Sequence, residues 1–180
     1  MHADGGCVTK AGSKRVSIGV YWGPASTFNL AQFATIGRFS NQRAELEAVV
    51  MALHPAGKRG MTKLILITYS AYALDHLTFH RNSKIESVPA DGTELVLTNA
   101  KGKSSKNQDL LLEILKQLRL PTCPKTFFQL IKRAFNTEAD SLAAVAVRTH
   151  LTKLISTVAV LQTRSHLRQQ YPQDTSHFPE

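Results

Sequence analysis

The stretch Asn41-Gln42-Arg43-Ala44-Glu45-Leu46-Glu47-Ala48 places acidic residues on a helix, and this feature decides how the rest of the chain is interpreted. Apolar residues recur at helical spacing through and beyond the stretch, and we expect the helix to end at Pro55-Ala56-Gly57. Glu45 on this helix faces two isolated carboxylates elsewhere in the chain, Asp4 and Asp140, if the fold brings them together. Carboxylate oxygens are the ligands that Mg²⁺ prefers, so the three residues together outline a metal site.

Each acidic residue also has a purely structural interpretation. Asp4-Gly5-Gly6 has the composition of an ordinary turn. Asp140 lies three residues after Thr137, where it could complete a helix capping box. Glu45 and Glu47 both flank the apolar stripe of their helix, so periodicity alone does not choose between them.

The composition bounds the class of protein. A chain of 180 residues with 43% apolar residues builds one full hydrophobic core, so we expect one domain over residues 1–151 and a helical extension and tail over residues 152–180. The chain has 22 Lys and Arg against 13 Asp and Glu, a formal charge of +9. This balance suits a polyanionic partner such as nucleic acid.

Cysteine usage and hydropathy indicate the compartment. Cys7 and Cys123 lie far apart and match no metal-ligand spacing, which is typical of a reducing compartment without a disulfide framework. The apolar run over residues 158–161 is too short to span a bilayer, and the N-terminus has no apolar targeting segment. We therefore expect an intracellular protein, nuclear or cytoplasmic, that is monomeric and makes no membrane contact.

Extended and helical patterns alternate along the chain. The expected strands cover residues 16–22, 28–36, 64–67 and 126–131, with the first two forming a hairpin and the third buried on both faces. We expect four helices. Three begin at Gln42, Asp109 and Thr137, the last of these continuing to about residue 151, and the fourth follows Ser70, which caps it. Residues 79–107 form a loop, with a hairpin around residues 95–97. The alternation of strand and helix indicates an α/β sheet.

Several motifs, in this order, resemble type 1 ribonuclease H. Asp4-Gly5-Gly6-Cys7 is similar to the first acidic motif of that family, residues 41–48 to its first helix, and residues 136–140 to its last acidic motif. Residues 18–23 and 99–103 are also similar to eukaryotic and fungal-like members. The resemblance covers roughly residues 3–145 and implies a ribonuclease H-like α/β fold with a five-stranded mixed sheet flanked by helices. It also implies cleavage of RNA/DNA hybrid at a two-metal Mg²⁺ site, with Glu45 rather than Glu47 as the ligand.

The resemblance further implies a set of residues that contact the substrate. Asn41 and Gln42 match the pair that reads the minor groove of the hybrid, where 2′-hydroxyls mark the RNA strand. Arg38 and Ser40, with Asn107 across the groove, match the pocket that binds a DNA phosphate. The alternatives are a solvated arginine and helix-capping polar groups, and capping is the simpler explanation for Ser40 alone.

The chain departs from the family pattern at Tyr69. Where the family has Thr-Asp-Ser after a central strand, this chain has Thr68-Tyr69-Ser70. A phenol with a pKa near 10 is neutral at pH 7, so it offers Mg²⁺ no charge. Asp75 does not replace the lost ligand, because it lies about 9 Å further along the helix and on another face. We therefore expect Asp4, Glu45 and Asp140 to bind Mg²⁺ or Mn²⁺ weakly or not at all.

Two further departures concern the ends of the motif. Residues 130–135 run into Asn136 without the histidine loop that precedes the family's last acidic helix. Only Met1, His2 and Ala3 precede Asp4, so we expect a shortened central strand and marginal stability.

Three hypotheses follow. The first is a ribonuclease H-like domain that binds RNA/DNA hybrid, with Mg²⁺-dependent RNA-strand endonuclease activity impaired or lost through Tyr69. The second is an active hybrid ribonuclease with a rearranged site. The third is a vestigial or protein-interaction domain whose basic face contacts no nucleic acid; a salt-dependent binding titration separates it from the others.

Overall fold

The structure is a computed structural model that describes residues 1–10, 13–34, 40–82, 97 and 105–149. The chain divides into two units, residues 1–147 and 148–180, and the fold given below is that of the first unit. Several predictions fall outside the described residues: the role of Arg38, the hairpin around residues 95–97, the motif at residues 99–103 and the tail. Within the described part of the chain, no helix has the length and apolar character needed to cross a membrane.

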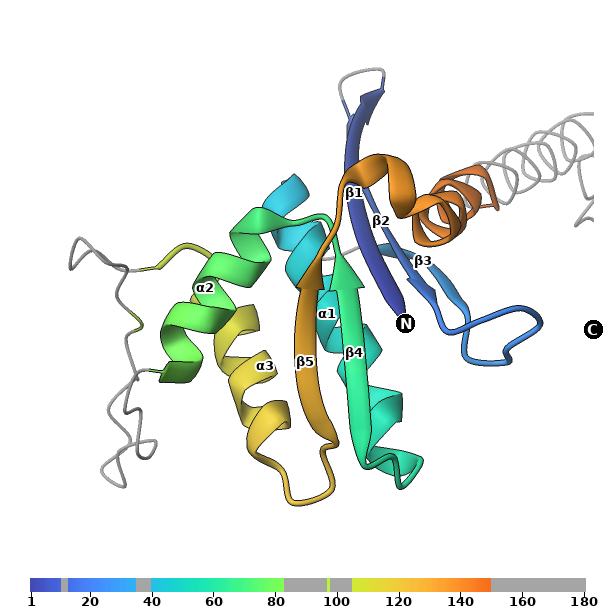
Figure 1. Ribbon diagram of the computed structural model, residues 1–180. Helices are drawn as coiled ribbons and strands as arrows, with labels where there is room; N and C mark the ends of the chain where they lie inside the picture. The colour runs from blue at the N-terminus through green and yellow to red at the C-terminus, as the bar shows by residue number, and fades with distance from the viewer. Residues whose placement is uncertain (11–12, 35–39, 83–96, 98–104, 150–180) are drawn as a thin grey trace, which may run out of the picture. The chain divides into compact units, whose positions relative to one another are not determined.

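The fold is built on a five-stranded mixed sheet with the strand order β3-β2-β1-β4-β5 (Figure 1). The strands are β1 His2–Lys10, β2 Ser13–Tyr21, β3 Leu30–Ala34, β4 Lys63–Thr68 and β5 Lys125–Leu130. β2 pairs antiparallel with both β1 and β3, which confirms the predicted hairpin, and β4 pairs parallel with β1 and β5. The predicted α/β fold with a five-stranded mixed sheet is therefore confirmed.

β1 is longer than predicted. Its nine residues pair with β2 along their whole length, so Asp4-Gly5-Gly6 is strand and the turn interpretation is wrong. A Cβ atom on Gly5 would lie 2.1 Å from the backbone of Ala44 in the first helix, so glycine at this position permits the helix to pack closely on the strand. Only one register pair, His2 with Ile67, joins β1 to β4. The pairing of β1 is therefore short only on its β4 side, whereas its pairing with β2 is complete.

The helices follow the apolar patterns, and two of them, α1 and α2, extend further than predicted. They are α1 Asn41–Lys58, α2 Ala71–Asn82, α3 Gln108–Arg119, the 3-10 turn η1 Arg133–Phe135 and a helix over residues 137–149. α1 continues through Pro55 because Ala56 is fully buried, so packing keeps the last turn helical despite the missing N–H group. α2 continues to Asn82, so the predicted loop begins later than residue 79; no glycine or proline interrupts the chain before Asn82.

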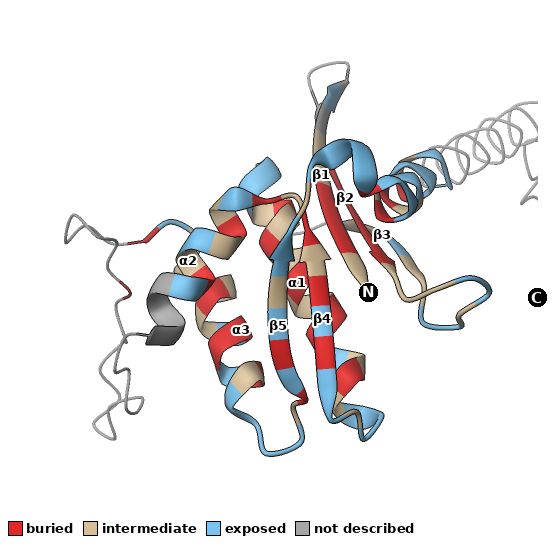
Figure 2. Ribbon diagram, viewed as in Figure 1, coloured by how far each residue is buried: buried red, intermediate tan, exposed pale blue. Residues whose placement is uncertain are grey.

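The core lies between one face of the sheet and the helices α1, α2 and α3 (Figure 2). Its largest fully buried side chains include Ile18, Leu46, Leu66, Leu77, Leu111 and Ile114. On β4, buried residues alternate with more exposed ones. Ile65, which pairs with Phe127 of β5, is 53% exposed. The prediction that this strand is buried on both faces is wrong, because among the described residues α1 to α3 cover one face only.

The part of the last helix that lies in the first unit, residues 137–147, packs on the sheet at β2. A Cβ atom on Gly19 would lie 2.0 Å from the carbonyl oxygen of Ala139, so only glycine permits this close approach. Asn136, immediately before the helix, is fully buried and donates from Nδ2 to the carbonyl oxygen of Ala3 at 3.1 Å. Its Oδ1 lies 3.0 Å from Nδ1 of His2. Asn136 thus fixes the start of the last helix against the start of β1.

Candidate active site

Asp4 lies on β1 with its side chain directed into the protein. The residue is 3% exposed, and its Oδ1 atom has no hydrogen-bond partner among the described residues. The pKa of Asp4 is raised to about 6, chiefly by burial and also by the nearby charge of Asp140, while the Tyr69 hydrogen bond and the charge of Arg133 act in the opposite direction. A buried carboxylate oxygen without a partner is costly, so this position favours a neighbouring cation.

Tyr69 follows β4 and lies beside Asp4. The parallel register that pairs His2 with Ile67 brings Asp4 level with Tyr69. The phenol hydroxyl donates to the carbonyl oxygen of Gly5 at 3.5 Å. Burial raises the pKa of Tyr69 above its usual range, and the charges of Asp4 and Glu45 raise it further. The side chain is therefore a neutral phenol at neutral pH.

The structure separates Glu45 from Glu47, which the sequence pattern left open. Glu45 accepts a short hydrogen bond from the Ser70 hydroxyl, next to Tyr69. Burial raises the pKa of Glu45, whereas the Ser70 hydrogen bond and the charge of Arg133 lower it. Glu47 instead lies near Arg43, whose charge lowers its pKa against the larger effect of burial. Glu45 is thus the α1 carboxylate that binds Ser70 and whose charge acts on Tyr69.

Ser70 connects the site to the helix that follows it. Its Oγ accepts from the Ala73 N–H at 3.0 Å, so Ser70 caps α2 as predicted. The same hydroxyl donates to Oε2 of Glu45, so this carboxylate oxygen already has a hydrogen-bond partner. A single side chain therefore orients both the helix and the carboxylate.

Asp140 lies in the first turn of the last helix and forms an ion pair. Its Oδ1 atom accepts from Nη2 of Arg133 at 2.9 Å. The Asp140 N–H donates to the carbonyl oxygen of Asn136, while the Thr137 hydroxyl donates to Glu138. The capping-box interpretation of Thr137 and Asp140 is therefore wrong.

Arg133 is a site residue that the sequence interpretation missed. Its guanidinium carbon lies 5.2 Å from the centroid of the Tyr69 ring, in addition to the ion pair with Asp140. Its positive charge lowers the pKa of Asp4, Glu45 and Tyr69. The sequence feature that could have identified Arg133 is its position in residues 130–135, the segment that lacks the family's histidine.

Asp4, Glu45 and Asp140 form what we call the carboxylate cluster. The described residues contain no group of three or more His, Cys, Asp or Glu side chains arranged to hold a metal ion. Within the cluster, one Asp140 oxygen binds Arg133, one Glu45 oxygen binds Ser70, and Tyr69 is neutral. In this arrangement the residues do not fit the two-metal site that the family resemblance implies.

The predicted substrate residues lie at the N-terminal ends of α1 and α3. Ser40 is the N-cap of α1 and accepts from the Arg43 N–H at 3.2 Å, so it has the capping role. Asn41 and Gln42 are exposed, and the Asn41 Oδ1 accepts from the Cys7 N–H at 2.8 Å. Asn107 is the N-cap of α3 and has left-handed backbone angles, with φ of 56°.

A bidentate ion pair joins these two helix ends. Nη1 and Nη2 of Arg43 donate to the two carboxylate oxygens of Asp109 at 3.0 and 2.7 Å. The Asn107 Nδ2 donates to the Tyr72 hydroxyl at 3.4 Å, which extends the contact to α2. The structure thus brings Ser40, Asn41, Gln42 and Asn107 to one end of the helical layer.

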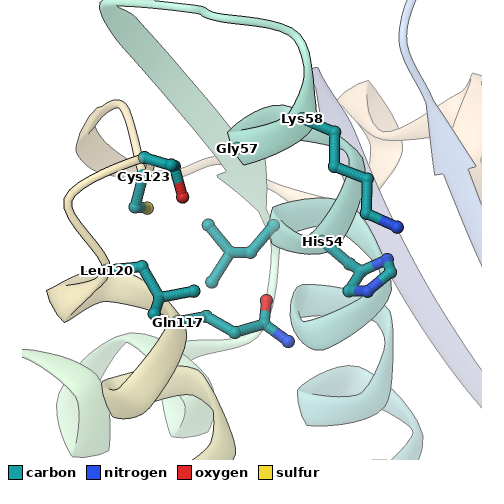
Figure 3. A pocket seen from close by; sticks show the side chains of 8 residues that line it. His54, Gly57, Lys58, Gln117, Leu120 and Cys123 are labelled. Atoms are coloured by element: carbon teal, nitrogen blue, oxygen red, sulfur yellow. The ribbon is translucent and has the colours of Figure 1, made fainter.

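A pocket lies away from these residues, between the C-terminal ends of α1 and α3 (Figure 3). Its lining residues include Leu53, His54, Lys58, Gln117, Leu120 and Cys123. No residue of the carboxylate cluster lines this pocket.

Comparison with known proteins places the chain in a family. The RNase H family model matches residues 1–148, so the chain belongs to the RNase H family. It is 39% identical to ribonuclease H1 of Mus musculus and 37% identical to that of Homo sapiens, each over 75 residues. These matches cover 41% of this chain and 26% of each relative, so the chain matches about a quarter of the curated relatives' length.

Solved structures share the fold at lower identity. LC11-RNase H1 in complex with RNA/DNA hybrid is 20% identical with a TM-score of 0.53, over 83% of this chain and 96% of that one. A foamy viral protease-reverse transcriptase in complex with RNA/DNA hybrid is 19% identical with a TM-score of 0.55, over 82% of this chain and 20% of that one. RNase H1 of Halobacterium salinarum is 21% identical with a TM-score of 0.50, and the match covers 82% of this chain and 97% of that one. At these identities the likeness shows the fold alone.

Proposed function

We propose that this domain binds RNA/DNA hybrid, and that its Mg²⁺-dependent cleavage of the RNA strand is impaired or lost. The observation that carries the proposal is the neutral Tyr69 phenol beside Asp4 and Glu45, where the family motif has a carboxylate. Cleaving a phosphodiester with two cations requires carboxylates that hold the ions on either side of the phosphate. The loss of one ligand costs several kcal/mol of transition-state stabilisation, and each 1.36 kcal/mol is about tenfold in rate.

Hybrid binding does not depend on the carboxylate cluster. The exposed Asn41 and Gln42 lie at the start of α1, and the Arg43–Asp109 ion pair holds the start of α3 beside them. Because the Cys7 N–H binds the Asn41 oxygen, the NH₂ group of this amide is the part that would donate to a 2′-hydroxyl. The formal charge of +9 favours a polyanion. Two of the solved relatives with this fold hold RNA/DNA hybrid.

The test is a pair of measurements on the full chain. Fluorescence anisotropy with RNA/DNA hybrid, double-stranded DNA and double-stranded RNA, each at two salt concentrations, measures affinity and the number of phosphate contacts. A nicking assay with Mg²⁺ or Mn²⁺ measures cleavage. The expected result is salt-sensitive binding that favours the hybrid, with feeble or no cleavage. Absence of hybrid binding would support a vestigial or protein-interaction domain, and ordinary turnover would support an active enzyme with a rearranged site.

A further inference from the structure

Arg133 contacts two residues of the candidate site, Asp140 and Tyr69, and acts electrostatically on the other two, Asp4 and Glu45. It extends from η1, binds the Asp140 carboxylate at 2.9 Å and lies against the Tyr69 ring. Its charge also acts on the two carboxylates that it does not bind, Asp4 and Glu45. One cation of the protein itself therefore faces the whole carboxylate cluster.

We infer that the Arg133 guanidinium is the resident cation of the carboxylate cluster and occupies the place where the family motif implies a divalent ion. The inference rests on the proposed function only in treating Asp4, Glu45 and Asp140 as one site. It does not depend on whether the domain cleaves or binds hybrid.

The chemistry of the two unusual residues is complementary. Carboxylates that converge in a partly buried site repel one another and need a positive charge nearby. A guanidinium is charged at every physiological pH, binds carboxylates through a planar fork and stacks on aromatic rings. Tyr69 supplies the ring face for this contact, which an aspartate at the same position would not. The tyrosine thus removes a metal ligand and adds a support for the arginine.

The guanidinium excludes a divalent ion in two ways. It occupies Oδ1 of Asp140, an oxygen that the ion would need as a ligand. It also adds a positive charge that acts on Asp4 and Glu45, and a like charge beside these carboxylates should disfavour a second cation by about tenfold or more in affinity. An exposed ion pair alone contributes little, so the test must separate this role from a general surface charge.

The main experiment measures Mn²⁺ and Mg²⁺ binding to the metal-free full chain by calorimetry, with Mn²⁺ binding also measured by electron paramagnetic resonance. Arg133→Gln should raise the Mn²⁺ association constant by about tenfold or more, because it removes the competing charge and frees Asp140. Lys132→Gln is the matched control, since it removes the same charge from the adjacent exposed residue. It should change the association constant by less than about threefold. Equal effects of the two variants, or tight Mn²⁺ binding by the wild type, would overturn the inference.

Thermal unfolding gives a second readout that does not depend on the size of the binding signal. In EDTA, Arg133→Gln should unfold at a lower temperature than Lys132→Gln, because its carboxylates have lost their counter-ion. Added Mn²⁺ should raise the unfolding temperature of Arg133→Gln more than that of either other protein. If Mn²⁺ shifts all three proteins equally, Arg133 is not the resident cation.

A pair of substitutions at Tyr69 keeps the inference testable if Arg133→Gln does not fold. Tyr69→Phe keeps the ring under the guanidinium, whereas Tyr69→Leu removes it. Tyr69→Leu should therefore bind Mn²⁺ more tightly than Tyr69→Phe, by about threefold. Equal binding by this pair would contradict the supporting role of the ring. Hybrid affinity, measured on the same proteins, reports separately on the proposed function.

Discussion

Tyr69 lies between Asp4 and Glu45 at the end of β4, so a carboxylate at this position would complete the family's ligand set. Tyr69→Asp should raise the rate of hybrid cleavage in Mg²⁺ or Mn²⁺ above the wild-type rate, because it restores a charged oxygen ligand. Adding Asp4→Asn to Tyr69→Asp should abolish the gain. A nicking assay measures both effects. Wild-type turnover of about 1 per second or faster would contradict this account of Tyr69.

Asp4 makes the stability of the fold depend on pH. Because burial raises its pKa from 3.8 to about 6, the folded chain binds more protons than the unfolded chain between these values. Asp4 therefore contributes fully to stability below its unfolded pKa, and this contribution is lost as the pH rises through about 6. Asp4→Asn should raise the unfolding temperature at pH 7.5 by several degrees, because the raised pKa corresponds to about 3 kcal/mol of destabilisation when Asp4 is ionised. The gain should shrink toward pH 4.5 in thermal melts recorded in EDTA.

Asp109 provides a control of opposite sign. Its hydrogen bonds with Arg43 lower its pKa, so its contribution is present above its unfolded value and is lost as the pH falls. Asp109→Asn should therefore lower the unfolding temperature at pH 7.5. If Asp4→Asn and Asp109→Asn shift the unfolding temperature at pH 7.5 in the same direction, burial does not control the titration of Asp4.

At the scale of elements, β1 leaves part of β4 without a partner strand. The Met1 ammonium donates to the Ile65 carbonyl at 3.3 Å, and the Ile67 N–H donates to the Met1 carbonyl at 2.9 Å. Among the described residues these contacts and the His2–Ile67 pair are what join the two strands. The backbone of Lys63, which faces the same edge, lies beyond the reach of β1.

An added segment should complete this pairing. Four β-branched residues placed before Met1 should extend β1 along β4 to Lys63 and raise the unfolding temperature by several degrees. Each new hydrogen bond contributes about 1 kcal/mol, and each kcal/mol raises the unfolding temperature by about 2–4 °C. A Gly-Ser extension of equal length is the control, because it supplies backbone without β propensity. Equal unfolding temperatures for the two extensions would show that no strand forms there.

At the scale of the whole molecule, the proposed hybrid binding combines the net charge of +9 with the two joined helix ends. Arg38→Ala should weaken hybrid binding and reduce the slope of log affinity against log salt by about one contact, since one phosphate partner is lost. Arg119→Ala removes the same charge from the opposite end of α3 and should leave the slope unchanged. Anisotropy titrations at several salt concentrations measure both. Equal slopes for the two variants would remove Arg38 from the phosphate-binding role.

Local patterns in the sequence determined much of this protein. Alternation and apolar runs located β2 to β5, helical periodicity located α1 and α3, and Ser70 was identified as a cap. These features depend on neighbouring residues and on the repeat of each element, so they are visible without a fold. The order of the acidic motifs also indicated the family, which the match over residues 1–148 confirms.

Only the tertiary structure decided which groups meet at the site. Glu45 was separated from Glu47 by its hydrogen bond with Ser70 and by the charge of Arg43 near Glu47, and pairing with β2 showed that Asp4-Gly5-Gly6 is strand. Arg133 joined the carboxylate cluster because the turn after β5 carries it over Tyr69. Such contacts link residues far apart in the chain, and their energies depend on burial and neighbouring charge. Neither quantity is defined until the sheet and helices have packed.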